Sequence, residues 1–397
     1  MSIAGNEGIT QMRGSIFAVL LLLSTVCYPQ SVPPRFTMEW DALAAHVVGR
    51  LDLQPGERFL AVAHPGFFDE LIPHIRYEVM KAGAVDLGVL DVLADPVPAD
   101  WSEAVLREGG QATRRALAEM LKDVDASIML PGANPTHPAY TAVKDLLQAR
   151  NGRTIHLHWM ENGSVVPLPG QALPPRHVIE ATYQRALLET DYDALSAHQR
   201  RFEQAMRVGE VRITSPAGTD IRFRIGDRPV NFQDGDASAA RADRGVILID
   251  REIELPAGVV RVAPLEATVN GTIAFPPSQW SGRPVTGLVL TFEAGHVVAI
   301  SAESGQRAIE AEIAAAGSSG SAFREFALGF HPLLAVPQEN PWIPYYGYGA
   351  GVVRLSLGDN SELGGDVGGG YVRWNFFTET TVTVDGDVWV EDGRLVR

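Results

Sequence analysis

Two segments near the end of the chain place arginine on what the sequence predicts to be β-strands. The first is GVVRLSL, which carries Arg354, and the second is YVRWNFF, which carries Arg373 and Asn375. A guanidinium group has five hydrogen-bond donors and no acceptor, so it can bind a carboxylate or an oxyanion but cannot ligate a metal ion. These side chains are therefore candidates for anion binding. The alternative is that they are ordinary solvent-exposed arginines.

Strand alternation predicts which of these side chains share a face. In the second strand Arg373 and Asn375 lie on one face. The other face of that strand carries apolar side chains: Val372, Trp374 and Phe376. In the first strand Arg354 and Ser356 lie opposite an apolar face. Each strand is therefore expected to present one polar face.

Other chemically capable residues occur in less specific settings. His156 and His158 are two positions apart, a spacing that can bind metal, but they lie on a predicted core strand without a third ligand nearby. Structural roles are expected for both. The aromatic segment NPWIPYYGYG, residues 340–349, either walls a ligand cleft or covers the core. The sequence contains no G-x-S-x-G elbow and no glycine-rich phosphate motif, so no cofactor is expected.

Residues 36–195 alternate between helix-like and strand-like segments. Helical spacing occurs in WDALAAHVVGRL, FDELIPHIRYEVMKAG and HPAYTAVKDLLQARNG, and short apolar segments occur in RFLAVAHP, AVDLGVLDV, DASIMLPG and TIHLHWM. This alternation predicts an α/β domain, a parallel sheet with flanking helices. A helix over residues 196–208 is expected to connect it to the rest of the chain.

Residues 209–397 have a different pattern, dominated by strand-like segments separated by turn sequences such as PAG, EAG and EDG. One helix is expected over residues 306–316. The second domain is therefore predicted to be mainly antiparallel and β-rich. A chain of 397 residues is also long enough for two domains.

The first 31 residues resemble a targeting segment. Met12 and Arg13 precede an apolar run over residues 16–26, which predicts a secretory signal peptide and makes Met12 an alternative start to Met1. Export to a periplasm or secretion is expected. The only cysteine, Cys27, follows this run, and a lipoprotein interpretation is less favoured because Val26 is bulky. The exported domains would contain no cysteine, which excludes disulfides and thiol catalysis.

Six phrases of the second half, taken together, resemble a known enzyme family. They are SPAGTDIRFRI, LPAGVVRVAPLEATVNGTIAF, LTFEAGHVV, REFALGFHP, GVVRLSLGDN and YVRWNFF. In order and spacing they are similar to the M29 metallo-aminopeptidases, the aminopeptidase T group, and to related dioxygenases that open dihydroxypyridine rings. The resemblance implies a homodimer and a two-metal site that activates water.

The same resemblance implies five metal-ligand positions, of which this chain keeps one. The positions fall on Val259, Glu325, Arg354, Arg373 and Asn375. Valine has no lone pair, arginine has no acceptor, and asparagine is a poor ligand for a transition metal. No metal is therefore expected at this site. If the family fold holds, the polar faces converge on Glu325, one arginine pairs with it, and the other binds an anion.

Three functions remain open from the sequence. The favoured one is an M29-like protein that binds a peptide terminus or small carboxylate without metal-dependent hydrolysis. The second is an enzyme in which Glu325 is the general base and the arginines hold an anionic group. The third is a working metallo-aminopeptidase with relocated ligands, for which the candidates are Asp359, Glu362, Asp366 and Glu379. The net charge of −15 disfavours nucleic-acid binding in all three.

Overall fold

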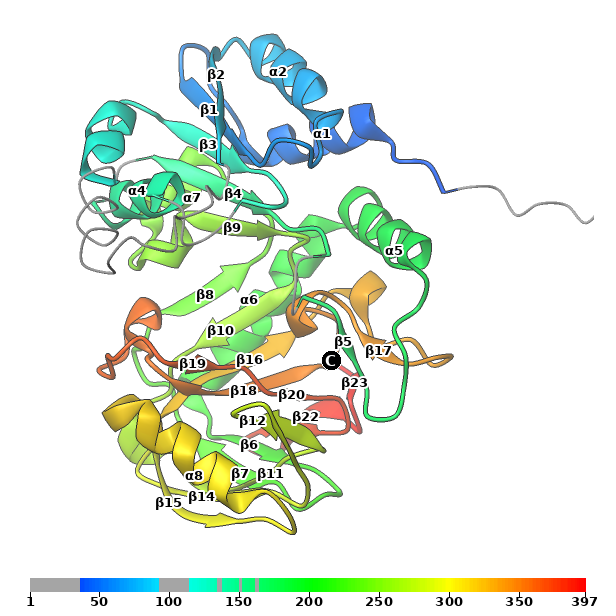
Figure 1. Ribbon diagram of the computed structural model, residues 1–397, viewed down its shortest axis with the longest axis vertical. Helices are drawn as coiled ribbons and strands as arrows, with labels where there is room; N and C mark the ends of the chain where they lie inside the picture. The colour runs from blue at the N-terminus through cyan, green and yellow to red at the C-terminus, as the bar shows by residue number, and fades with distance from the viewer. Residues whose placement is uncertain (1–35, 93–113, 134–137, 150–151, 161–163) are drawn as a thin grey trace, which may run out of the picture. The chain divides into compact units, whose positions relative to one another are not determined.

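The computed structural model describes residues 36–92, 114–133, 138–149, 152–160 and 164–397 (Figure 1). The predicted signal peptide, residues 1–31, lies outside this part of the chain. Within the described part, no helix has both the length and the apolar character needed to cross a membrane.

A parallel sheet occupies the first half of the chain, as the sequence predicts. Its strands β1 (Arg58–Ala63), β2 (Val85–Asp91), β3 (Ala126–Met129) and β4 (Arg153–Leu157) lie in the order β2-β1-β3-β4. Every neighbouring pair is parallel. The apolar runs become these strands because both faces of such a sheet are covered by helices.

Most helices correspond to predicted segments. They are α1 (Trp40–Leu51), α2 (Leu71–Lys81), α4 (Pro138–Gln148) and α6 (Tyr192–Val208), and residues 114–121 are also helical. The helix α5 (Arg176–Leu188) was not predicted from the sequence. The connecting helix begins earlier than residue 196, because the Asp191 side chain caps it by accepting a hydrogen bond from the Ala194 N–H.

A fifth strand of the parallel sheet comes from far along the chain. Strand β9 (Glu252–Leu255) runs parallel to β4, and its register pairs Thr154 with Glu252 and His156 with Glu254 (Figure 1). Paired residues of adjacent strands share a face, so these four side chains lie on the same side of the sheet. The domain boundary near residue 209 stays a prediction, and sheet pairing crosses it.

The remainder of the chain forms mostly antiparallel sheets, which confirms the predicted fold class. The six-stranded sheet contains β8 (Val230–Gln233), β10 (Val259–Val262), β16 (Phe323–Gly329), β18 (Val353–Gly358), β19 (Val372–Arg373) and β20 (Phe376–Phe377). The eight-stranded sheet contains β6 (Val211–Thr214), β7 (Asp220–Phe223), β11 (Asn270–Ala274), β14 (Val289–Glu293), β15 (His296–Ser301), β21 (Thr381–Val384), β22 (Asp387–Glu391) and β23 (Arg394–Leu395).

Shorter elements complete the second half. The predicted helix at 306–316 is present as α8 (Gln306–Ala315). The others are α7 (Ala239–Arg244) and the two-stranded ladders of β12 (Ser278–Trp280) with β13 (Arg283–Val285) and β5 (Val166–Pro167) with β17 (Trp342–Ile343).

The two faces of the six-stranded sheet differ in chemistry. On one face Phe326 of β16 packs near Phe202 of α6 and Phe223 of β7, with ring centres 6.1 and 5.2 Å apart. Its neighbour Glu325 is on the other face, because successive strand residues alternate. The apolar face therefore belongs to the core, and the opposite face is available for polar chemistry.

Candidate functional site

Three charged side chains lie together on the polar face of the six-stranded sheet. Ala327 of β16 pairs with Arg261 of β10 on one side and with Arg354 of β18 on the other. Glu325, two residues before Ala327, pairs with Ser356. Directly opposed residues of antiparallel strands share a face, so all of these side chains point the same way. The small side chain of Ala327 leaves room for the two guanidinium groups.

Glu325 is fully buried and surrounded by donors. Nε and Nη2 of Arg261 donate to its Oε2 at 3.1 and 2.9 Å, and the Ser356 hydroxyl donates to Oε1 at 3.2 Å. Nε of Arg354 lies 2.8 Å from Oε1. Burial alone would raise the pKa of Glu325, but the charges of Arg261, Arg354 and Arg324 hold it well below its ordinary value.

A second carboxylate extends this cluster. Glu362 accepts a hydrogen bond from Nη2 of Arg261 at 3.0 Å and also binds the guanidinium of Arg324. We call the five side chains Arg261, Arg324, Glu325, Arg354 and Glu362 the arginine–glutamate cluster. Three guanidinium groups face two carboxylates, so the cluster carries one net positive charge.

Arg354 lines the cavity described below and has unused hydrogen-bonding capacity. Its side chain is buried, its Nη1 donates to the Tyr346 carbonyl at 3.3 Å, and its guanidinium lies 5.0 Å from the ring centre of Trp374. Its Nη2 is buried without a hydrogen-bond partner among the described residues. Burial and the charge of Arg261 lower the pKa of Arg354, but a guanidinium titrates so far above neutrality that it stays charged.

Arg373 and Asn375 do not join the cluster, contrary to the expectation from the sequence. Arg373 instead binds Glu312 of α8, with Nη1 2.6 Å from Oε1, and its guanidinium stacks 3.5 Å from the ring centre of Trp280. The Asn375 amide donates to the Leu355 carbonyl at 3.1 Å. Whether either residue binds a ligand stays an untested prediction.

Strand register explains this correction. Arg373 pairs with Leu357, on the apolar face of β18, and Arg354 pairs with Phe376. The side chains that share a face with Arg354 are therefore Trp374 and Phe376. A shift of one residue in register exchanges the two faces of a strand, and sequence alternation alone does not determine it.

Sequence reasoning also missed Arg261, the strongest partner of Glu325. A signal was present, because Arg261 lies two residues after Val259 in the same strand and must share its face. Val259 is the position where the resemblance implies the first metal-binding carboxylate. Arg261 could therefore have been predicted to lie beside the implied metal site.

The arginine–glutamate cluster does not fit a divalent metal ion. Its carboxylates are already held by guanidinium groups, and Val259, Trp374 and Phe376 offer no metal ligand from the neighbouring strands. Among the described residues, no group of three or more histidine, cysteine, aspartate or glutamate side chains is placed to hold a metal.

The four acidic residues considered from the sequence as alternative metal ligands do not form a metal site. Three of them are bound by other groups of the protein, and the fourth is exposed. Asp359 accepts hydrogen bonds from the backbone N–H groups of Ser361 and Gly370, both at 2.9 Å. Asp366 binds Arg228 at 2.7 Å. Glu362 belongs to the arginine–glutamate cluster, and Glu379 is exposed.

A cavity of about 240 Å³ lies beside the cluster and is lined from both halves of the chain. The six-stranded sheet contributes Arg261 and Arg354, and the parallel sheet contributes His156, Glu252 and Glu254. The remaining lining residues are Tyr140, Lys144, His158, Ile249, Tyr346, Tyr348, Glu362 and Trp374. His156 and His158, expected to be structural, thus line the same cavity as Arg354.

The acidic residues of the parallel sheet differ in how they are paired. Glu252 is buried, accepts a hydrogen bond from the Tyr140 hydroxyl at 3.0 Å and lies 3.6 Å from Nζ of Lys144. Burial alone would raise the pKa of Glu252, but hydrogen bonding to His156 and the charge of Lys144 lower it. Glu254 accepts a hydrogen bond from the Tyr348 hydroxyl and forms no ion pair with any described residue.

The aromatic segment 340–349 both lines the cavity and covers the core. Tyr346 and Tyr348 line the cavity, whereas Tyr345 is fully buried. Tyr345 and Tyr346 have positive φ angles of 31° and 47°, a costly conformation for side chains of this size. The backbone of Tyr346 is fixed by donating to the Ser164 carbonyl at 2.8 Å. This segment thereby holds the Tyr346 carbonyl against Arg354.

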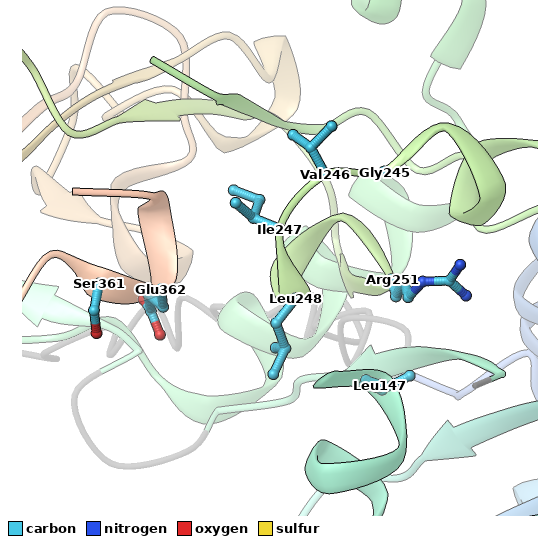
Figure 2. Close-up of a pocket in the computed structure, with 8 residues that line it drawn as sticks. All are labelled: Leu147, Gly245, Val246, Ile247, Leu248, Arg251, Ser361 and Glu362. Carbon is cyan, nitrogen blue, oxygen red and sulfur yellow. The ribbon is translucent and has the colours of Figure 1, made fainter. Parts of the chain in front are cut away.

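A neighbouring pocket of about 190 Å³ is less suited to bind a ligand. Figure 2 shows Glu362 and Arg251 on opposite sides of it, with the Arg251 guanidinium directed away from Glu362. Nη1 of Arg251 donates to the Gly152 carbonyl at 2.9 Å. The polar groups of this pocket therefore do not converge, unlike those of the cavity beside Arg354.

Comparison with known proteins supports the resemblance found in the sequence. A model of the M29 family, described as thermophilic metalloprotease, matches residues 190–333. No curated protein sequence matches the chain.

Two solved structures are similar over most of the chain. The 2,5-dihydroxypyridine dioxygenase of Pseudomonas putida KT2440 has a TM-score of 0.59 at 14% identity, over 90% of this chain and 96% of that one. Wild-type AmpT of Thermus thermophilus has a TM-score of 0.55 at 20% identity, over 90% of this chain and 99% of that one. At these identities the likeness establishes the fold. Residues 190–333 thus carry the resemblance to the M29 metalloproteases that the sequence predicts.

Proposed function

We propose that this protein has replaced the metal site of an M29-like ancestor with the arginine–glutamate cluster, and that the adjacent cavity binds a small carboxylate, such as a peptide terminus, without metal-dependent hydrolysis. The observation that carries the proposal is Nη2 of Arg354, which is buried beside the cavity without a hydrogen-bond partner among the described residues. A buried donor without a partner costs free energy, and a bound carboxylate would relieve that cost.

The cluster favours binding over base catalysis. Glu325 is paired with Arg261 and Arg354, and its lowered pKa makes it a weak acceptor of a proton near neutral pH. A general base needs a pKa closer to the working pH. The role of Glu325 is therefore to hold the two guanidinium groups in place, and Nη2 of Arg354 remains available to the ligand.

Calorimetric titration with pentanoate in the presence of EDTA tests this proposal. Wild-type protein should bind pentanoate, Arg354→Gln should lose that binding, and Arg373→Gln should retain it because Arg373 is paired with Glu312 outside the cavity. Failure of pentanoate to bind, or equal binding by Arg354→Gln, would contradict the proposal.

A second measurement addresses the chemistry. Hydrolysis of aminoacyl substrates should not be stimulated by added Zn²⁺, Co²⁺ or Mn²⁺. Stoichiometric metal that survives dialysis and is lost in Glu325→Ala, together with metal-stimulated hydrolysis, would instead indicate a working metallo-aminopeptidase.

A further inference from the structure

The cavity beside Arg354 contains one positive and one negative group whose hydrogen-bonding and ion-pairing capacity the described residues do not fully use. In the arginine–glutamate cluster three guanidinium groups face two carboxylates. Nε of Arg354 lies 2.8 Å from Oε1 of Glu325, but its Nη2 has no hydrogen-bond partner among the described residues. Of the two carboxylates that β9 contributes to the cavity, Glu252 is offset by Lys144, whereas Glu254 has no ion-pair partner among the described residues. Both Arg354 and Glu254 line the cavity.

Tyr348 lies close to both charged groups. The Arg354 guanidinium carbon is 5.9 Å from the centre of the Tyr348 ring, and the Tyr348 hydroxyl donates to Oε2 of Glu254. Arg354 and Glu254 are thus both neighbours of one aromatic side chain. The hydroxyl occupies one acceptor position of Glu254, and a carboxylate has further lone pairs for a second donor.

Arg354 and Glu254 together restrict the chemical class of the ligand more than Arg354 alone does. A simple monocarboxylate would pair with Arg354 and leave Glu254 without a counter-charge. A dicarboxylate would bring a second negative charge towards Glu254, which is unfavourable because like charges repel at short range. An ammonium group on the same molecule as the carboxylate would satisfy both walls and leave the cavity neutral.

We propose that the cavity binds a small zwitterion, an amino acid whose carboxylate pairs with Arg354 and whose ammonium group pairs with Glu254. This rests on the proposed carboxylate-binding function and specifies its ligand class. The volume of about 240 Å³ limits the ligand to a small molecule. Trp374 and Tyr346, with ring centres 5.3 Å apart, supply an aromatic wall for its apolar atoms.

A set of small ligands with five carbon atoms or fewer can distinguish the contributions of the two charges to binding. Pentanoate carries the carboxylate alone, butylamine carries the amine alone, and 5-aminopentanoate and L-norvaline carry both at different spacings. At least one zwitterion should bind about tenfold or more tightly than pentanoate, the effect expected of one additional hydrogen bond to a charged group. Calorimetry at neutral pH with EDTA measures all four.

Two variants test whether Glu254 and Arg354 cause the tighter binding of the zwitterion. Glu254→Gln should lose the advantage of the zwitterion while still binding pentanoate, because glutamine can still accept the Tyr348 hydroxyl. Arg354→Gln should lose binding of both. Glu391→Gln, at an exposed position of β22, is the control for removal of a negative charge and should bind like wild type.

The outcomes separate this inference from the proposed function. If pentanoate binds as tightly as both zwitterions, or if Glu254→Gln keeps the full advantage, the zwitterion proposal is wrong and carboxylate binding stands. If butylamine binds as tightly as the zwitterions, their carboxylate contributes nothing to binding and the zwitterion proposal is wrong. If none of the four ligands binds, both proposals fail.

Discussion

At the scale of single residues, a fully buried carboxylate such as Glu325 must have positive charge within hydrogen-bonding distance. The family resemblance implies that metal ions supply this charge in related enzymes. In this chain Arg261 and Arg354 supply it, with planar groups that can donate two hydrogen bonds to one carboxylate. The guanidinium groups thus compensate the charge of Glu325 without offering a Lewis-acidic centre.

Removal of Arg261 should therefore destabilise the protein strongly. Arg261→Met removes the guanidinium that donates hydrogen bonds to both Glu325 and Glu362, and breaking a buried pair in this way costs about 3–5 kcal/mol. Urea unfolding measures the loss in the free energy of unfolding.

The matched control is Arg212→Met, which breaks an exposed pair with Asp220 at 2.7 Å. Exposed pairs contribute about 0–1 kcal/mol, so this variant should remain close to wild type. Equal losses in the two variants would show that the cluster does not depend on Arg261.

At the scale of secondary-structure elements, long periodic segments were predictable and relations between strands were not. The helices α1, α2, α4 and α8 follow from apolar spacing in the sequence. Strand β9 was missed because Glu252–Leu255 is short, and nothing in four residues shows that they pair with β4 instead of forming a hairpin. The residues of the candidate site were equally hard to predict wherever their position depends on how strands pair.

Glu325 and Arg354 could be placed in the site from the sequence, whereas Arg373 could not. The pattern within β18 correctly separates Arg354 from the apolar residues around it. The pairing of Arg373 with Leu357 depends on the register between two strands, which is set by packing across the whole sheet. Glu254 could not be identified either, because only the pairing of β9 with β4 places it beside His156.

His331 links two elements through a buried imidazole. Its Nε2 lies 3.1 Å from the Ala186 carbonyl of α5, and its Nδ1 accepts from the Leu333 N–H at 3.2 Å. The side chain is fully buried. Burial lowers the pKa of His331 from 6.5 to about 4, although its hydrogen bond to Ala186 acts in the opposite direction.

This shift predicts a pH dependence of stability. Between pH 6.5 and 4 the unfolded histidine binds a proton and the folded one does not, so acidification favours unfolding across that window. Wild type should lose about 2–3 kcal/mol more than His331→Gln between pH 7 and 4.5. Urea unfolding at the two pH values measures this difference, and His296→Gln, on the exposed edge strand β15, should behave like wild type. Parallel losses in wild type and His331→Gln would contradict the assignment.

At the scale of the whole molecule, the parallel sheet is completed by a strand from the second half. Residues 36–397 form one compact unit, and β9 pairs with β4 along four residue positions. The chain enters β9 from β8 and leaves it for β10, both of which belong to the six-stranded sheet. Separation of the two halves would therefore break backbone hydrogen bonds as well as the cavity.

We accordingly expect the two halves to unfold as one cooperative unit. In native-state hydrogen exchange, the amides of β1 and β3 should show the same free energy of opening as those of β10 and β16, because cooperative units share one opening reaction. Arg261→Met, which acts in the six-stranded sheet, should lower both values equally. As an independent check, residues 36–208 expressed alone should fail to fold, since β4 would lose its neighbour β9. Protection of β1 and β3 that is unaffected by Arg261→Met, with a folded 36–208 fragment, would establish two independent domains with a boundary near residue 209.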